Sequence, residues 1–343
     1  MKPEAAIGFF NIEGAVEEIA PFGLGHINDT FLVKAGGKQY LLQKVNRRVF
    51  KYVDILEHNV HFVLQARPEL FPFHFKTKEG RIHVVYDEDC WRLQAFYEDA
   101  YSPDQVGESQ IVHSIGGGFG AFASAFAHIP AEEFKETIPN FHDLGSRIFQ
   151  LEKAVQLNPV NRMEMVSELI LNAFSYRWIA ERFQKLVANG LPKRLCHNDA
   201  KAANILLHKR DNSFAKIIDL DTIGPGYLLY DYGDLMRSLF TPAPENELDP
   251  AKLIVRPEFF RILKEAYLKE ITFDLDEIEL SSLEFGGLYM TYLMGIRFLT
   301  DFIQGDVYYK TSFENENFIR ARNQFRLLEH MERALSHNYQ LEA

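Results

Sequence analysis

Polar and hydrophobic residues alternate through much of the first hundred positions, and this alternation predicts β-strands. Glycine-containing turns at 23–25 and 36–37 separate the first three strands, which should therefore pair as antiparallel neighbours. Residues 52–67 carry hydrophobic side chains three or four positions apart, which is the spacing of a helix with one buried face. The predicted strands cover residues 15–22, 27–35, 38–45, 81–86 and 90–97.

The rest of the chain has mostly helical periodicity. Hydrophobic residues at helical spacing predict helices over 105–128, 164–189 and 281–304, and a final amphipathic helix follows. Two short apolar runs, 205–208 and 215–221, are separated by a polar turn and predict a β-hairpin. We therefore expect an α+β chain with two lobes, a strand-rich lobe over residues 1–98 and a helical lobe over residues 99–343.

Composition allows a large core and narrows the function. The chain has 343 residues, of which 47% are hydrophobic, and its net charge of −11 argues against binding the phosphate backbone of nucleic acid. The longest apolar stretch, 285–296, is too short to cross a bilayer, and no basic and apolar leader opens the sequence. We expect neither a membrane anchor nor secretion. Two cysteines provide no disulfide framework, which suits the reducing cytoplasm.

The segment 195–204 contains the pattern with the clearest chemical meaning. His197 is followed two positions later by Asp199, and Asn204 comes five positions after that aspartate. This is the layout of the protein-kinase catalytic loop, H-R-D-x-x-x-x-N. In that loop the aspartate receives the proton of an attacking hydroxyl and the asparagine binds Mg²⁺ beside the nucleotide phosphates. Because so short a pattern also arises by chance, its value depends on the residues around it.

The hairpin that follows this segment supports the interpretation. Its second strand ends in a carboxylate, and strand pairing can bring Asn204 and Asp219 to the same end of the hairpin. Two oxygen ligands suit Mg²⁺, which leaves other positions to water and phosphate. Lys201, two residues after Asp199, can reach a transferring phosphoryl group, or it is an ordinary exposed lysine. The sequence therefore predicts a site for ATP and Mg²⁺.

The turn between the first two strands is a candidate phosphate-covering loop. Gly23 and Gly25 would allow backbone amides close to the phosphates, although the same glycines also suit an ordinary hairpin. His26 and Asn28 follow directly. They either face the nucleotide or satisfy their own backbone as turn residues.

The third strand should carry the cation that pairs with the α- and β-phosphates. Gln43 and Lys44 occupy this place, and only one of them can point into the cleft because side chains alternate along a strand. Glu57 on the next helix is the candidate partner of the lysine, or else an ordinary exposed carboxylate. A glycine cluster at 116–120 lacks the Gly-Lys-Ser/Thr of a P-loop, so close helix packing explains it better.

The last long apolar helix carries two charged residues four positions apart, Arg297 and Asp301. They share one helix face, where an ion pair among aromatic residues is costly unless it meets a partner. The pair either binds a substrate or is a buried structural pair. Tyr309 and further arginines follow, and carboxylate, arginine and tyrosine groups together suit a polyhydroxylated ligand.

These motifs together resemble the aminoglycoside phosphotransferase-like small-molecule kinases, most closely the bacterial N-acetylhexosamine 1-kinases. The resemblance covers nearly the whole chain. Its motifs are E-G-A-V at 13–16, G-H-I-N at 25–28, H-N-D-x-K-x-x-N-I-L at 197–206, I-D-L-D-T at 218–222, R-F-L-x-D at 297–301 and G-D-x-Y at 305–308.

The resemblance implies a bilobal protein-kinase-like fold with a five-stranded antiparallel N-lobe and a mostly helical C-lobe. It also implies that ATP and Mg²⁺ are used to phosphorylate the anomeric hydroxyl of a small-molecule sugar, GlcNAc or GalNAc. One departure is that the basic residue of the third strand aligns with Gln43, one place before Lys44. The implied roles are catalytic base for Asp199, Mg²⁺ ligands for Asn204 and Asp219, and sugar contacts for Asp221, Arg297 and Asp301, with Tyr309 nearby.

Three alternative functions differ in how well they match this pattern. The same fold can phosphorylate another small alcohol or amine, such as choline, homoserine or an aminoglycoside. A sulfatase acting on mucin-type sugars would need a Cys-x-Pro-x-Arg motif, which neither Cys90 nor Cys196 provides. A non-catalytic nucleotide-binding module is disfavoured because Asp199, Asn204 and Asp219 are all present.

Overall fold

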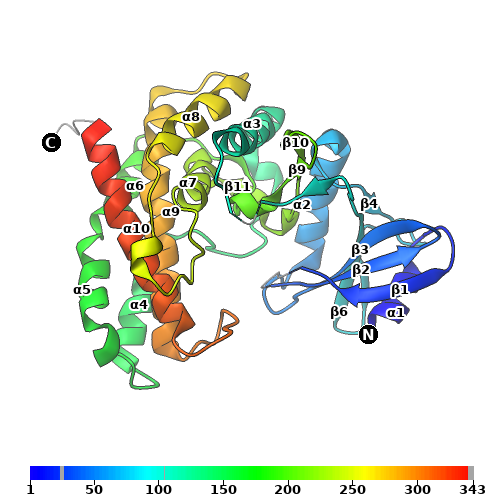
Figure 1. The fold of residues 1–343 in the computed structure, drawn as a ribbon, viewed down its shortest axis with the longest axis horizontal. Coiled ribbons are helices and arrows are strands. Elements are labelled where there is room, and N and C mark those ends of the chain that lie inside the picture. The colour runs from blue at the N-terminus through cyan, green and yellow to red at the C-terminus, as the bar shows by residue number, and fades with distance from the viewer. Residues whose placement is uncertain (24–26, 104, 339–343) are drawn as a thin grey trace.

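A computed structural model describes residues 1–23, 27–103 and 105–338. Figure 1 shows two lobes, a strand-rich N-terminal lobe mostly in blue and a helical C-terminal lobe coloured from cyan to red. This arrangement confirms the predicted α+β, two-lobed fold. Across the described ranges, no helix is both long enough and apolar enough to cross a membrane.

The N-terminal lobe is built on a six-stranded antiparallel sheet with the order β1-β2-β3-β6-β4, in which β5 also pairs with β6. The sequence predicted five of these strands and missed β4, which is only two residues long and too short to show alternation. A short α1 helix (Pro3–Ala6) and helix α2 (Val53–Ala66) accompany the sheet. The strands are β1 (Val16–Pro21), β2 (Asp29–Ala35), β3 (Lys38–Val45), β4 (His74–Phe75), β5 (Val84–Tyr86) and β6 (Asp89–Ala95).

Two small sheets lie in the C-terminal lobe and carry the segment 195–204. The predicted hairpin is present as β9 (Ile205–His208) and β10 (Phe214–Ile217), and β7 (Ala100–Tyr101) pairs with β9 on its other side. Strand β8 (Arg194–Cys196) pairs with β11 (Gly224–Gly226). The catalytic-loop pattern therefore runs from the end of β8 to the start of β9.

Eight α-helices, from 9 to 28 residues long, form most of the C-terminal lobe within the described residues. One predicted helix, 164–189, is instead a short 3₁₀ turn (Glu164–Val166) followed by two helices that break at Tyr176 and Arg177. The helices are α3 (Ser109–Phe126), α4 (Leu144–Leu157), α5 (Ser167–Ser175), α6 (Trp178–Ala188), α7 (Leu228–Leu239), α8 (Glu258–Glu270), α9 (Glu277–Gln304) and α10 (Glu316–Asn338).

Helix α9 is the centre of this lobe. It is buried on nearly all sides, as expected for a helix whose apolar residues surround it, and α4, α7 and α10 pack against it. Asp276 caps its first turn by accepting a hydrogen bond from the backbone N–H of Glu279 at 2.7 Å. Gly305 ends it in a left-handed conformation with φ of 97°.

Helices α7 and α9 approach each other closely at two glycines. A Cβ atom added to Gly233 would lie 2.1 Å from the carbonyl oxygen of Gly286, too close for any side chain. The glycine cluster of α3 has the same role against α8, since a Cβ on Gly120 would lie 2.4 Å from the carbonyl oxygen of Tyr267. This confirms that the cluster at 116–120 serves helix packing.

Gly233→Ala should therefore destabilise the protein, although alanine is the better helix former. Overpacking of this kind costs about 1–3 kcal/mol, and each kcal/mol lowers the melting temperature by roughly 2–4 °C in a large domain. Gly117→Ala is the matched control, because its new Cβ would meet only the Cγ of Glu270 at 3.8 Å. Thermal unfolding of both variants tests the argument, and an equal effect of the two substitutions would contradict it.

Candidate active site

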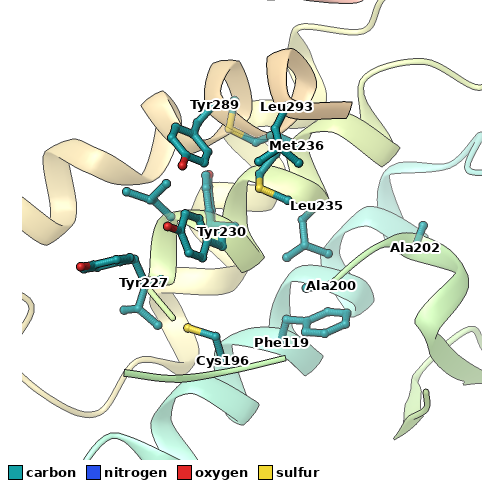
Figure 2. Packing of buried hydrophobic residues seen from close by; sticks show 14 of the residues in the cluster. Phe119, Cys196, Ala200, Ala202, Tyr227, Tyr230, Leu235, Met236, Tyr289 and Leu293 are labelled. Carbon is teal, nitrogen blue, oxygen red and sulfur yellow. The ribbon is translucent and has the colours of Figure 1, made fainter. Parts of the chain in front are cut away.

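The loop between β8 and β9 is held from behind by the start of α7. Both carboxylate oxygens of Asp231 accept backbone hydrogen bonds, from His197 and from Asn198, each at 2.7 Å. The ring of His197 contacts the carbonyl oxygen of Ile218 at 2.9 Å through Nε2. Figure 2 shows Cys196 and Ala200 packed among aromatic and aliphatic side chains of α3, α7 and α9. The loop therefore has one arrangement fixed by both polar and apolar contacts.

Asp199, Lys201 and Asn204 converge in this loop. Lys201 Nζ and Asn204 Nδ2 both donate to Asp199 Oδ2, at 2.9 and 2.8 Å. Asp199 Oδ1 accepts no hydrogen bond from the described residues, and the side chain is 26% exposed. Burial opposes ionisation of Asp199, but Lys201 and neighbouring donors outweigh it and lower the pKa to about 2. One oxygen of an ionised carboxylate is thus available to an incoming hydroxyl.

Asp219 lies just beyond the hairpin and completes the group. It has a left-handed backbone with φ of 61°, an unfavourable conformation for a residue other than glycine, and such residues gather at functional sites. The backbone N–H of Ile218 donates to the carbonyl oxygen of Asn204 at 3.0 Å and ties the two segments together. Burial, then the negative charges of Asp221 and Asp199, raise the pKa of Asp219 to about 7.

These residues fit a divalent cation. Asn204 Nδ2 donates to the backbone carbonyl oxygen and to Oδ2 of Asp199, each at 2.8 Å, and the Asn204 side-chain oxygen accepts no hydrogen bond from the described residues. A half-buried carboxylate whose charge is disfavoured by two other carboxylates gains most from a nearby positive ion. The described residues contain no cluster of three or more histidine, cysteine, aspartate or glutamate side chains suited to a metal. Mg²⁺ needs fewer protein ligands when phosphate oxygens and water supply the rest.

Strand β3 turns Gln43 and Lys44 to opposite sides of the sheet. Lys44 pairs with Asp89 at 2.7 Å and lies 5.8 Å from the ring of Trp91. Gln43 Oε1 accepts a hydrogen bond from Nε of Arg92, its cross-strand neighbour on β6, at 2.8 Å. Arg92 in turn forms a buried ion pair with Asp221. Lys44 therefore points away from Asp221, and Glu57 pairs with Arg81 rather than with Lys44.

The predicted phosphate-covering turn is described only in part. Gly23 has a positive φ of 77°, whereas Gly25 and His26 lie outside the described residues. Asn28 donates through Nδ2 to Asp221 Oδ2 at 2.6 Å and accepts from the backbone N–H of Asn46 at 2.9 Å. Asn28 thus reaches across from the N-terminal lobe to the segment after Asp219.

Arg297 and Asp301 do not pair with each other, so the alternative of a buried structural ion pair is wrong. The Arg297 guanidinium lies over the rings of Phe141, Tyr309 and Tyr308, at 4.9, 5.4 and 5.6 Å from their centroids. Within the described part of the chain the guanidinium has no carboxylate partner, and its Nη1 contacts Sδ of Met294 at 3.5 Å. Burial opposes its charge, but the tyrosines and the Asp199 carboxylate raise its pKa. Phe141 is followed by His142, whose Nε2 contacts the carbonyl oxygen of Asn198 at 2.8 Å, so Arg297 lies near the catalytic loop.

Asp301 faces the loop after α9. It accepts hydrogen bonds from the backbone N–H groups of Val307, Tyr308 and Tyr309 at 2.8 to 3.0 Å, and from Asn317 Nδ2 at 3.0 Å. With an exposed fraction of 3%, Asp301 holds the two tyrosines beside Arg297. The hydroxyl of Tyr309 is buried and has no hydrogen-bond partner among the described residues. The sugar contacts predicted for Asp221 and Asp301 would require each to give up existing hydrogen bonds.

The fold and the site define a kinase-like phosphotransferase, with an N-terminal sheet above a loop that presents Asp199, Lys201 and Asn204 beside Asp219. Residues 18–267 match the phosphotransferase enzyme family, APH, which is most of the chain. The protein therefore belongs to this family and is a phosphotransferase.

Several solved structures share the fold over nearly the full length of both chains. A microcompartment-associated aminopropanol kinase has 15% identity over 97% of this chain and 96% of its own, with a TM-score of 0.65. Choline kinase from Cryptosporidium parvum Iowa II has 14% identity over 94% and 90%, with a TM-score of 0.62. Spectinomycin phosphotransferase, solved with ADP and spectinomycin, has 14% identity over 96% and 97%, with a TM-score of 0.60. At these identities the likeness is one of fold.

Two residues of the site were not predicted from the sequence. Arg92 is fully buried in β6, and Phe141 covers the guanidinium of Arg297. A signal for Arg92 was present, because a charge within the apolar run 90–93 must be buried and compensated. Phe141 offered none, since a single aromatic residue in a loop is compatible with many positions.

Proposed function

We propose that this protein transfers the γ-phosphoryl group of ATP, held with Mg²⁺, to the anomeric hydroxyl of an N-acetylhexosamine, GlcNAc or GalNAc. The arrangement of Asp199, Asn204 and Asp219 supports the use of a nucleotide and a metal ion. The resemblance in the segments 297–301 and 305–308 supports the amino-sugar acceptor. Two buried free cysteines suit the reducing cytoplasm, where ATP is abundant.

The observation that carries the acceptor class is the half-buried cation at Arg297, stacked on aromatic rings. A guanidinium beside the acceptor position repels cationic acceptors such as choline, aminopropanol or an aminoglycoside. It can donate hydrogen bonds to hydroxyl and acetamido oxygens, and it is held in place by three aromatic rings. A neutral polyhydroxylated molecule with an amide therefore fits this side of the site better than an amine.

A cavity of about 310 Å³ lies beside the catalytic loop and is large enough for a monosaccharide. Phe141, the residue that covers Arg297, is part of its lining, and so are His142 and Asn198. His142 Nδ1 and Asn198 Oδ1 are fully buried and have no hydrogen-bond partners among the described residues. We place the sugar between Asp199 and this cavity.

In the proposed reaction Asp199 Oδ1 accepts a hydrogen bond from the sugar O1 hydroxyl and orients the oxygen in line with the γ-phosphorus. The new O1–P bond forms as the bond to the ADP oxygen breaks, and ADP leaves with the electron pair. Because its pKa is about 2, Asp199 takes the proton late, when O1 already carries positive character. Lys201 balances charge beside Asp199, and Asn204 and Asp219 would hold Mg²⁺, which neutralises the phosphates.

The test is ADP release with ATP and Mg²⁺ over a panel of GlcNAc, GalNAc, glucose, galactose, choline and kanamycin. We expect turnover with the two N-acetyl sugars and a product whose phosphate has the acid lability of an anomeric phosphate. Turnover with choline or kanamycin but with neither N-acetyl sugar would assign the protein to another alcohol or amine on the same fold.

Arg297→Gln should raise the KM for the sugar by about 10–100-fold and leave the KM for ATP nearly unchanged, because the loss of charge-assisted hydrogen bonds costs about 1.5–3 kcal/mol. Arg182→Gln is the matched control. Arg182, on α6, also stacks on an aromatic ring, with its guanidinium 4.7 Å from the ring centroid of Phe285. Steady-state kinetics decide the question. An unchanged sugar KM in the Arg297 variant would remove Arg297 from the acceptor site.

A further inference from the structure

Strand β3 was expected to supply a cation to the nucleotide side of this site, but its Lys44 is paired with Asp89 at 2.7 Å. The adjacent strand β6 carries a fully buried arginine, Arg92. Arg92 is directly opposite Gln43 in the pairing of β3 with β6. It has no exposed surface, and it binds Asp221 through both terminal nitrogens. Its Nε donates to Gln43 Oε1 at 2.8 Å. A fully buried arginine is costly, so its position is specified by these partners.

The ion pair connects the two segments between which a nucleotide would lie. Asp221 belongs to the turn that begins at Asp219, two residues before it. Asn28, which directly precedes strand β2, donates to the same carboxylate at 2.6 Å. Gln43 also donates to Thr30 Oγ1 at 3.1 Å. One carboxylate of the C-terminal lobe is thus bound by two residues from strands or turns of the N-terminal sheet.

We propose that the Arg92–Asp221 ion pair sets the position of Asp219 relative to the N-terminal sheet, and so determines how tightly the metal-bound nucleotide is held. The Arg92–Asp221 pair would take the role of the lysine–glutamate pair that orders protein kinases. The candidates for that pair here, Lys44 and Glu57, bind Asp89 and Arg81 instead. Arg92 is a positioning residue, because its complete burial keeps it from touching a ligand. The proposal rests on the proposed use of a nucleotide and is independent of the acceptor.

The double variant Arg92→Met/Asp221→Asn removes both charges together and leaves neither of them buried alone. We expect a MgADP dissociation constant raised about tenfold or more, within the 5–150-fold range of energetic coupling between sites. The KM for ATP should rise in parallel, and the KM for the sugar should stay within about twofold of wild type. Calorimetry with MgADP in the absence of sugar gives the first number, and steady-state kinetics give the others.

Arg194→Met/Glu279→Gln is the matched control. It removes another arginine–carboxylate pair, with a 2.7 Å contact and a carboxylate that is 2% exposed, within the C-terminal lobe. This variant should lose stability but keep wild-type MgADP affinity. Equal losses of MgADP affinity in the two double variants would show that destabilisation alone is responsible, and would overturn the proposal. So would wild-type affinity in a folded Arg92→Met/Asp221→Asn variant.

Arg92→Lys decides the question if the double variant does not fold. A lysine keeps the charge but loses the forked contacts to Asp221 and Gln43, so MgADP affinity should fall about 3–10-fold, less than in the double variant. Wild-type affinity in folded Arg92→Lys would overturn the proposal. Failure of the wild-type protein to bind MgADP would refute the proposed nucleotide-dependent function itself, and this outcome is separate from any difference between variants.

Discussion

Asp199→Asn should lower kcat by about 10²–10⁴-fold and leave the affinity for MgADP nearly unchanged, because a positioned proton acceptor contributes a rate factor of this size. The amide is close to the carboxylate in shape and can still accept hydrogen bonds from Lys201 and Asn204, which both bind Asp199 Oδ2. What it cannot do is take the proton of the sugar hydroxyl. The substitution therefore separates chemistry from binding.

Asp276→Asn is the control for this substitution, because Asp276 caps α9 through a hydrogen bond to the Glu279 N–H and asparagine is an equally good cap. It should have wild-type kinetics. Near-normal turnover by Asp199→Asn would remove Asp199 from the role of base. A large loss of MgADP affinity in that variant would instead show that Asp199 holds the nucleotide site together.

Much of this fold follows from periodicity alone. Strand β3, at residues 38–45, was predicted with the bounds that the structure has, since alternation is clear where a strand lies in the middle of a sheet. The break between α5 and α6 was not predicted, because the helical spacing of apolar residues in 164–189 continues across Tyr176 and Arg177. Tertiary packing decides such breaks, and a single sequence carries little information about it.

The catalytic loop could be recognised because its residues are close together in the chain. Asp199, Lys201 and Asn204 lie within six positions, and the hairpin brings Asp219 back to them. Contacts between distant segments could not be predicted in this way. Arg92 and Asp221 are 129 residues apart, and nothing local connects them.

The four-residue spacing of Arg297 and Asp301 was a poor guide to their partners, because a loop competes for the Asp301 side chain. Arg297 and Asp301 are one helical turn apart and suit an ion pair. The backbone N–H groups of 307–309 lie close to Asp301 because the chain reverses at Gly305, and they bind its carboxylate instead. A carboxylate that accepts several N–H groups is already well compensated, and the arginine is left facing aromatic rings.

Asp219→Asn should have opposite effects on stability and on activity. Burial and the negative charges of Asp221 and Asp199 disfavour the Asp219 carboxylate, whose pKa is raised to about 7. Replacing it with a neutral amide removes that repulsion, so the variant without ligands should melt at a higher temperature than the wild-type protein. The same change removes the only carboxylate that we propose as a metal ligand, and kcat/KM should fall by about 100-fold or more.

The measurement is a pair of melting curves for each protein, without ligand and with saturating Mg²⁺ and ADP. Wild type should gain stability from the ligands, in proportion to the logarithm of their concentration over the dissociation constant, and Asp219→Asn should gain little. Asp211→Asn, at the exposed turn of the same hairpin, should behave as wild type in both conditions. A variant at Asp219 that is less stable without ligand and still stabilised by Mg²⁺ and ADP would contradict the assignment, because its carboxylate would then be a structural group. The charge of a metal-binding carboxylate is unfavourable until the cation binds. Loss of such a carboxylate should therefore raise the stability of the ligand-free protein and remove its stabilisation by Mg²⁺ and ADP.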